Sequence, residues 1–227
     1  MIGDIYHICN RGIRKEKIFD TNADYLRFVL NLYRLNNKDG SLRITSNNKT
    51  VESFPEQDKL VEVLKWTLLP NHYHLLLYEK VDGGVLEFVK RLGNSFTKYL
   101  NIKREASGYV FQNSAKIILI DNNEYLKHIP FYVDLNLVDA TYLQLKNEKQ
   151  LNLEKTIEYF RKYKWASFRD YFGENSSGFG KITNKELFYD IFDTNAKIYL
   201  KELEFYIKDG SYKSVDLFDP KNVNLAG

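Results

Sequence analysis

The chain has 227 residues, 44% of them hydrophobic and 28% charged, which is enough for one well-cored domain with an appendage. Its 33 Lys and Arg residues against 30 Asp and Glu give a net charge of +3, which by itself does not indicate a nucleic-acid partner. The single cysteine, Cys9, excludes an internal disulfide and fits a reducing compartment. The sequence contains neither an apolar run of about 18 residues nor a signal-peptide pattern, so we expect a cytoplasmic protein with no membrane contact.

The first part of the chain has the apolar spacing of alternating strands and helices. A strand is predicted over residues 4–9, and Thr21 then caps a helix whose apolar side chains recur every three and four residues. Residues 37–58 are polar and turn-rich, which predicts a long surface loop. Two strands follow, over residues 60–69 and 73–80, and the short turn between them predicts an antiparallel hairpin.

A helix over residues 85–103, a strand over 115–120 and a helix over 124–138 complete this pattern. The order β-α-β-β-α-β is typical of the ferredoxin-like (RRM-like) α+β fold, an antiparallel sheet with helices on one face. The third helix is additional, and it could lie across the other face. Further helices are predicted near the C-terminus, so we divide the chain into a domain over residues 1–140 and a helical extension over 141–227.

Two histidines, His72 and His74, begin the third predicted strand. Side chains alternate along a strand, so both point to the same face, with Cα atoms about 6.6 Å apart. Two imidazoles at that spacing can share one divalent metal ion. A bare H-x-H pair is a weak motif, and the alternative is that both histidines only pack within the protein.

Several segments together resemble the single-tyrosine HUH transposases, and especially the REP-associated tyrosine transposases. The most specific match is the stretch P-N-H-Y-H-L-L-L at residues 70–77, combined with Y-V-D-L-N at residues 132–136. Shorter matches support it: Y-H-I-C-N-R-G at residues 6–12, I-F-D at 18–20, F-Q at 111–112 and W-A-S at 165–167. The resemblance covers about residues 4–171.

The resemblance implies a metal-dependent endonuclease and strand transferase that acts on single-stranded DNA at hairpins. In that family a tyrosine attacks the scissile phosphate, leaving a 5′-phosphotyrosine and a free 3′-OH. The matching residues here are Tyr132 as nucleophile and His72 and His74 as ligands of Mg²⁺ or Mn²⁺. Members of the family are monomers or homodimers, and both states remain open here.

The chemistry of the residues agrees with these roles. Asn136 follows Tyr132 by four residues, so a helix projects both side chains from one face. An amide oxygen is a suitable ligand for Mg²⁺ or Mn²⁺, so one helix could deliver the nucleophile and a third ligand. His7, in the first strand, could line the same site or be an ordinary strand residue. The chain has 17 tyrosines, and the competing candidates for the nucleophile are Tyr99, Tyr109 and Tyr125.

Basic side chains are concentrated between residues 88 and 116, where Glu105 is the one acidic residue. Such a cluster can contact DNA phosphates, although a solvated helix face would have the same composition. The candidate DNA-binding residues are Arg11, Lys90, Arg91, Lys98 and Lys116.

The chain departs from the family pattern at two positions of the third helix. Leu137 follows Asn136 where the family has proline, and Pro130 lies inside the predicted helix, where proline usually kinks or breaks it. Two alternatives therefore stay open: a non-catalytic module that binds single-stranded nucleic acid through a decayed HUH site, and a phosphoesterase that uses water. The absence of an RRM-type aromatic signature counts against the first, and the single H-x-H pair counts against the second.

Overall fold

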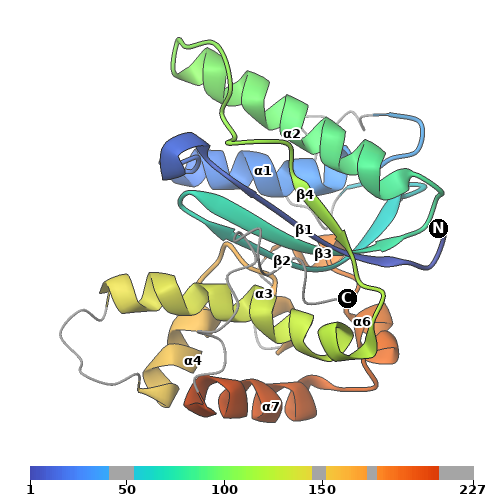
Figure 1. Cartoon of the computed structure of the whole chain (residues 1–227), viewed down its shortest axis with the longest axis vertical. Coiled ribbons are helices and arrows are strands. Elements are labelled where there is room, and N and C mark those ends of the chain that lie inside the picture. Colours follow the sequence, from blue (N-terminus) through green and yellow to red (C-terminus); the bar gives the residue numbers. More distant parts are fainter. Residues whose placement is uncertain (41–53, 145–151, 173–177, 210–227) are drawn as a thin grey trace.

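The computed structural model describes residues 1–40, 54–144, 152–172 and 178–209 (Figure 1). Most of the loop expected over residues 37–58 lies outside these ranges. In the described residues one antiparallel sheet contains four strands in the order β2-β3-β1-β4. Their bounds are Ile5–Arg11 for β1, Val61–Leu69 for β2, His72–Glu79 for β3 and Lys116–Leu119 for β4. This order confirms the ferredoxin-like α+β fold.

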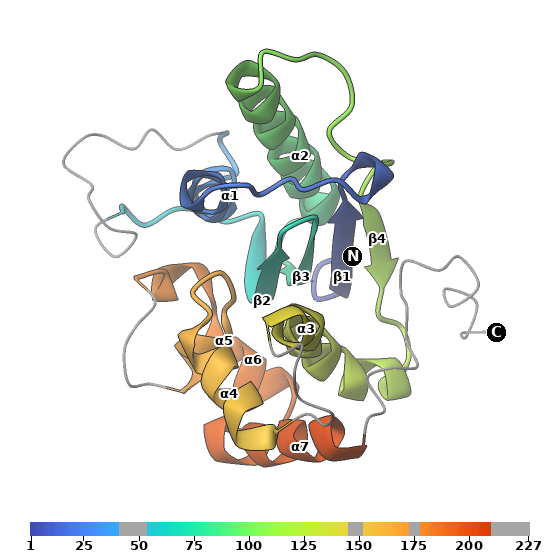
Figure 2. The ribbon, with the colours of Figure 1, turned by 90° about the vertical axis from the view of Figure 1, so that its left-hand side faces the viewer.

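Two helices, α1 (Asn22–Arg34) and α2 (Gly84–Lys103), cover one face of the sheet (Figure 2). Helix α1 begins where predicted, at the capping box of Thr21 and Asp24, in which the Asp24 carboxylate accepts the backbone N–H of Thr21 at 2.8 Å. The apolar faces of both helices pack on the sheet in a first core. Fully buried members of this core include Ile8, Phe28, Trp66, Leu75 and Phe96.

Helix α3 (Asn123–Gln144) crosses the opposite face of the sheet, the position considered for the additional helix (Figure 2). It runs through Pro130 as one helix, so the proline does not end it. The boundary predicted near residue 140 falls inside this helix. The C-terminal helices are α4 (Leu153–Lys162), α5 (Phe168–Tyr171), α6 (Lys185–Ile191) and α7 (Ala196–Asp209), and Figure 1 shows α4 and α7 below α3.

A second core fills the space between the sheet, α3 and the C-terminal helices. Its fully buried members include Leu76, Val133, Leu137, Phe160 and Phe188. Because both faces of the sheet are covered, every residue of β2 is buried. Among the described residues, no helix combines the length and apolar character needed to cross a membrane.

An irregularity in β2 brings a charged side chain into the second core. The pairing of β2 with β3 shifts register between Val63 and Lys65, which is the mark of a β-bulge. Two consecutive side chains, Leu64 and Lys65, therefore both face α3. The bulge thus breaks the simple alternation of the strand and buries Lys65 beneath the helix.

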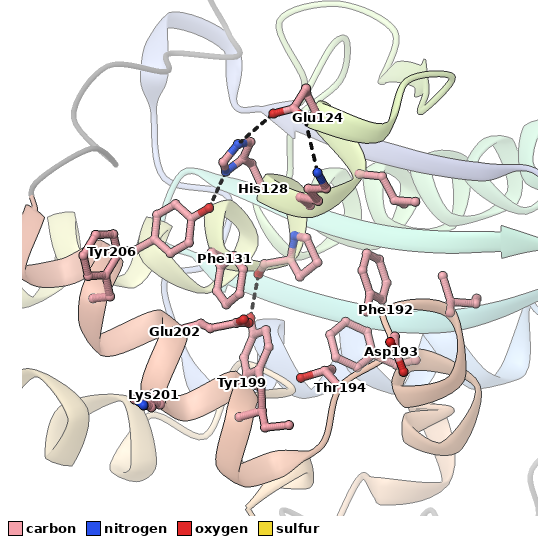
Figure 3. A pocket seen from close by; sticks show the side chains of 17 residues that line it. Glu124, His128, Phe131, Phe192, Asp193, Thr194, Tyr199, Lys201, Glu202 and Tyr206 are labelled. Carbon is pink, nitrogen blue, oxygen red and sulfur yellow. Dashed lines mark hydrogen bonds and ion pairs between the residues drawn. The ribbon is translucent and has the colours of Figure 1, made fainter.

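A cavity of about 840 Å³ lies on the side of α3 that faces α6 and α7 (Figure 3). Aromatic rings form much of its wall, and the His128 ring lies between the carboxylate of Glu124 and the hydroxyl of Tyr206. His72, His74, Tyr132 and Asn136 are not among its lining residues.

Candidate functional site

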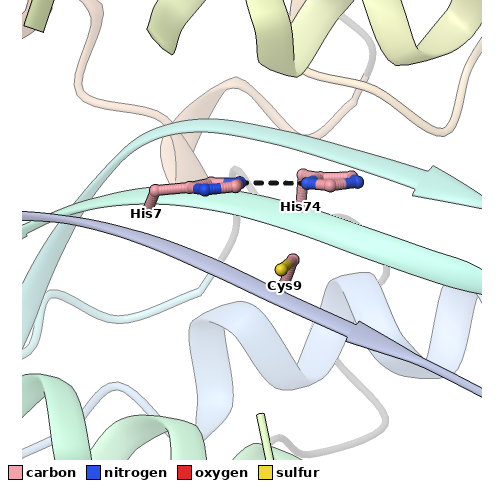
Figure 4. A group of neighbouring side chains, drawn as sticks. All are labelled: His7, Cys9 and His74. Atoms are coloured by element: carbon pink, nitrogen blue, oxygen red, sulfur yellow. Dashed lines mark hydrogen bonds between the residues drawn. The ribbon is translucent and has the colours of Figure 1, made fainter. Parts of the chain in front are cut away.

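The sheet gathers three histidines on the face that α3 covers. His72 and His74 share one face of β3, with ring centroids 5.3 Å apart. The ring of His7, on the neighbouring strand β1, is nearly parallel to that of His74, and their centroids are 5.2 Å apart. His7 Nε2 and His74 Nδ1 are hydrogen-bonded at 2.9 Å (Figure 4). The His7 ring is therefore in direct contact with the H-x-H pair.

Helix α3 brings Tyr132 and Asn136 against these histidines. The Tyr132 ring lies nearly perpendicular to the rings of His7 and His74, at centroid distances of 5.7 and 5.4 Å. The side chain of Asn136 hydrogen-bonds to His72, and its Nδ2 also donates to the Tyr132 carbonyl at 2.7 Å. The one-turn spacing of Tyr132 and Asn136 thus places both residues at the histidines.

Burial keeps the three histidines in their neutral form. It lowers the pKa of His7 to about 3, with a further contribution from the positive charge of Lys116. It also lowers the pKa of His72 to about 3, and the charge of Arg11 adds to the effect. Burial, then the neighbouring His7 and His72, hold the pKa of His74 well below its usual value. All three are neutral at pH 7, the form in which imidazole binds a metal.

Tyr125, one of the competing candidates for the nucleophile, and Cys9, which the sequence patterns did not single out for the site, also belong to this group of side chains. Cys9 pairs directly with His74 across the strands, and the potential ligand atoms of His7, Cys9 and His74 all lie within 4.8 Å of one another (Figure 4). The Tyr125 hydroxyl lies 3.3 Å from His7 Nδ1. The sequence contained a signal for each. Cys9 lies two residues after His7 on a strand, and Tyr125 lies seven residues, about two helical turns, before Tyr132, so each shares a face with a residue of the site.

The other two candidate tyrosines lie elsewhere. Tyr99 belongs to α2, on the opposite face of the sheet, where its hydroxyl donates to Asp24 Oδ1 at 2.8 Å. Tyr109 is 88% exposed. Tyr125 and Tyr132 are thus the two tyrosines of the candidate set that contact the histidine cluster.

The five candidate DNA-binding residues separate into two groups. Arg11 pairs with His72, and Lys116 with Cys9, so the strands place both on the face that carries the histidines. The other three lie on α2, across the sheet, where Arg91 is held by Glu87 at 2.7 Å and by the Asn37 carbonyl at 2.6 Å. The structure therefore brings two cations, not five, to the histidine cluster.

Two donor sets in this cluster have the chemistry to hold a metal ion. His72, His74 and Asn136 offer two neutral imidazoles and an amide oxygen, which suit Mn²⁺ or Mg²⁺. His7, Cys9 and His74 include a thiol and would suit a softer ion such as Zn²⁺. Both sets contain His74. Only the first includes a residue of the helix that carries Tyr132, namely Asn136, whose Nδ2 donates to the Tyr132 carbonyl.

No family model matches the chain, and no curated protein matches its sequence. Among solved structures, the chain is similar to a REP-associated tyrosine transposase bound to a REP hairpin, with 14% identity and a TM-score of 0.47. The match covers 76% of this chain and 80% of that one.

Proposed function

We propose that this protein is a metal-dependent endonuclease and strand transferase of the single-tyrosine HUH kind, acting on single-stranded DNA at hairpins. The convergence of Tyr132 and Asn136, one turn apart on α3, with the histidines of β3 carries the proposal. The P-N-H-x-H and Y-x-x-x-N motifs of the transposase family support the same assignment. The ferredoxin-like sheet supplies the rigid frame for the histidines.

In this proposal His72, His74 and Asn136 hold Mg²⁺ or Mn²⁺. The fit rests on two imidazoles kept neutral by burial and on an amide that contacts one of them. When bound, the metal supplies a Lewis acid that polarises a phosphate oxygen of the DNA. Arg11 and Lys116 flank the cluster and would contact neighbouring phosphates.

Tyr132 acts as the nucleophile. Its hydroxyl oxygen bonds to the scissile phosphorus while the bond from phosphorus to the 3′ oxygen breaks. The phenol loses its proton and the departing 3′ oxygen gains one, so the products are a 5′-phosphotyrosine and a 3′-OH with no net proton released. Attack by a 3′-OH on the phosphotyrosine reverses the step and joins strands.

The test uses DNA hairpins from the flanks of the protein's own gene. We would incubate them with the full chain, with and without Mn²⁺, and separate the products on a denaturing gel. We expect a Mn²⁺-dependent band of covalent protein–DNA adduct that is absent for Tyr132→Phe. Tyr109→Phe is the matched control, because this exposed tyrosine lies outside the cluster and its loss should leave the adduct intact.

Two other results would point to the alternative functions. A complex seen only on a native gel, with no adduct under any condition, would identify a non-catalytic module that binds single-stranded DNA. Cleaved DNA with no adduct, unchanged in Tyr132→Phe, would identify a phosphoesterase that uses water.

A further inference from the structure

A chain of hydrogen bonds leads from Tyr125 through His7 to the proposed metal ligand His74. The Tyr125 hydroxyl lies 3.3 Å from His7 Nδ1, and His7 Nε2 lies 2.9 Å from His74 Nδ1. Neither His7 nor His74 is exposed to solvent. The proposed function gives roles to His74 and Tyr132, but it gives none to His7 or Tyr125.

The direction of these hydrogen bonds decides whether His74 can bind a metal. A neutral imidazole carries one proton on its two nitrogens. If His74 Nδ1–H donates to His7 Nε2, the lone pair of His74 lies on Nε2. If His7 Nε2–H donates instead, His74 carries its proton on Nε2 and cannot bind a metal through that atom.

We propose that His7 is a positioning residue that accepts a hydrogen bond from His74 Nδ1–H and so directs the lone pair on His74 Nε2 toward the metal. His7 Nδ1–H then donates to the Tyr125 hydroxyl, which fixes the His7 ring in turn. Partners of this kind set the tautomer and the ring orientation of metal-binding histidines. The inference rests on the proposed function, because it takes His74 as a metal ligand.

The packing around the pair supports this role. The His7 and His74 rings are parallel within 3°, and both are nearly perpendicular to the Tyr132 ring. Their strands are paired directly, which fixes the spacing of the two residues. The contact thus joins β1 to the H-x-H pair of β3, next to the Tyr132 side chain of α3.

Cys9 offers a competing explanation of the same contact. If a soft metal bound between His7, Cys9 and His74, His7 would be a ligand and would not orient His74. A thiol is a strong ligand for Zn²⁺ and a poor one for Mn²⁺, so the two explanations differ in metal preference and in their need for Cys9.

The experiment measures Mn²⁺ and Zn²⁺ affinity by calorimetry, without DNA, in the full chain. His7→Leu removes the acceptor and should lower Mn²⁺ affinity about 10- to 100-fold. His7→Gln places an amide oxygen near the position of Nε2 and should recover most of that loss. Tyr125→Phe should weaken Mn²⁺ binding less, and Cys9→Ala should leave it unchanged. Circular dichroism and hairpin binding on a native gel check that each variant is folded.

The outcomes separate this inference from the proposed function. If Mn²⁺ binding needs His72 but is the same in His7→Leu, the positioning role is overturned and the proposed function stands. If Zn²⁺ binds in preference to Mn²⁺ and Cys9→Ala abolishes binding, His7 is a ligand and the positioning role is again overturned. If the unmodified chain binds no Mn²⁺ at any tested concentration, both fail. If His7→Leu is unfolded, the Mn²⁺ affinities of His7→Gln and Tyr125→Phe still decide. An unchanged affinity in Tyr125→Phe together with a loss of affinity in His7→Gln would contradict the hydrogen-bond chain.

Discussion

Lys65 and Asp134 form an ion pair in the second core, with Lys65 Nζ 2.6 Å from Asp134 Oδ2 and neither side chain exposed to solvent. Lys65 lies on β2, and Asp134 lies on α3 between the proposed nucleophile and Asn136. The hydroxyl of Tyr199, on α7, donates to the same carboxylate oxygen at 2.8 Å. The contact therefore fixes the helix that carries Tyr132 to the sheet, and it joins the C-terminal helices to both.

Removing one partner of this ion pair should destabilise the fold strongly. Lys65→Met keeps the approximate length of the side chain but leaves the Asp134 carboxylate buried without its cation, which should cost about 3–5 kcal/mol of unfolding free energy. Urea unfolding followed by circular dichroism measures the change. In the double variant Lys65→Met/Asp134→Leu no buried charge remains, so much of the loss should be recovered. Equal losses in the single and double variants would show that the ion pair is not the cause.

The hydroxyl of Tyr199 should contribute to the same anchoring of α3. It donates to Asp134 Oδ2 and lies 3.0 Å from the Pro130 carbonyl, and the side chain is buried. Tyr199→Phe keeps the ring and should lower the unfolding free energy by about 1–3 kcal/mol, because a buried carboxylate loses a hydrogen bond. Tyr206→Phe, on the same helix, is the control, since its partner His128 is exposed and the expected change is within about 0.5 kcal/mol. Comparable effects in the two variants would contradict the prediction.

The buried histidines should make stability fall on mild acidification. In the unfolded chain a histidine takes up its proton near pH 6.5, whereas His7 and His72 stay neutral in the folded protein down to about pH 3. Below pH 6.5 the unfolded state binds more protons, so the free energy of unfolding should fall as the pH is lowered. Each such histidine contributes a slope of up to about 1.4 kcal/mol per pH unit.

Urea unfolding of the metal-free protein between pH 7 and pH 5 measures this slope, in a range where most carboxylates stay ionised. His7→Gln removes one of the titrating groups, so its stability should depend less steeply on pH. A slope that is the same in both proteins would show that His7 takes up its proton over the same pH range in the folded and the unfolded state.

Lys116 should contribute to DNA binding, whereas Lys90 should not. Lys116 lies on the face of the sheet with the histidines, and Lys90 is exposed on α2 across the sheet. Lys116→Gln should weaken hairpin binding and reduce the slope of log affinity against log salt concentration by about one, because one phosphate contact is lost. Lys90→Gln removes the same charge and should leave the slope unchanged. Fluorescence anisotropy with a labelled hairpin measures the affinity and its salt dependence for both variants. A larger effect of Lys90→Gln than of Lys116→Gln would indicate that the DNA binds to α2.

The sequence determined the elements of this fold and part of the candidate site. The strands and helices follow from apolar spacing and from the capping box at Thr21, which are local properties of the chain. The shared face of His72 and His74 follows from strand alternation, and the shared face of Tyr132 and Asn136 follows from the helical period. These relationships need no knowledge of distant residues, so a sequence pattern could predict them.

The tertiary structure alone decided which of these faces meet. The packing of α3 on the sheet opposite α1 and α2 joins Tyr132 to the histidines, and the pairing of β1 with β3 brings His7 against His74. The same topology separates Arg11 and Lys116 from the basic residues of α2. The burial of Lys65 depends on a β-bulge and on a carboxylate 69 residues away along the chain. Periodicity fixes the direction of a side chain within its own element, whereas its partners depend on long-range packing, which no local pattern encodes.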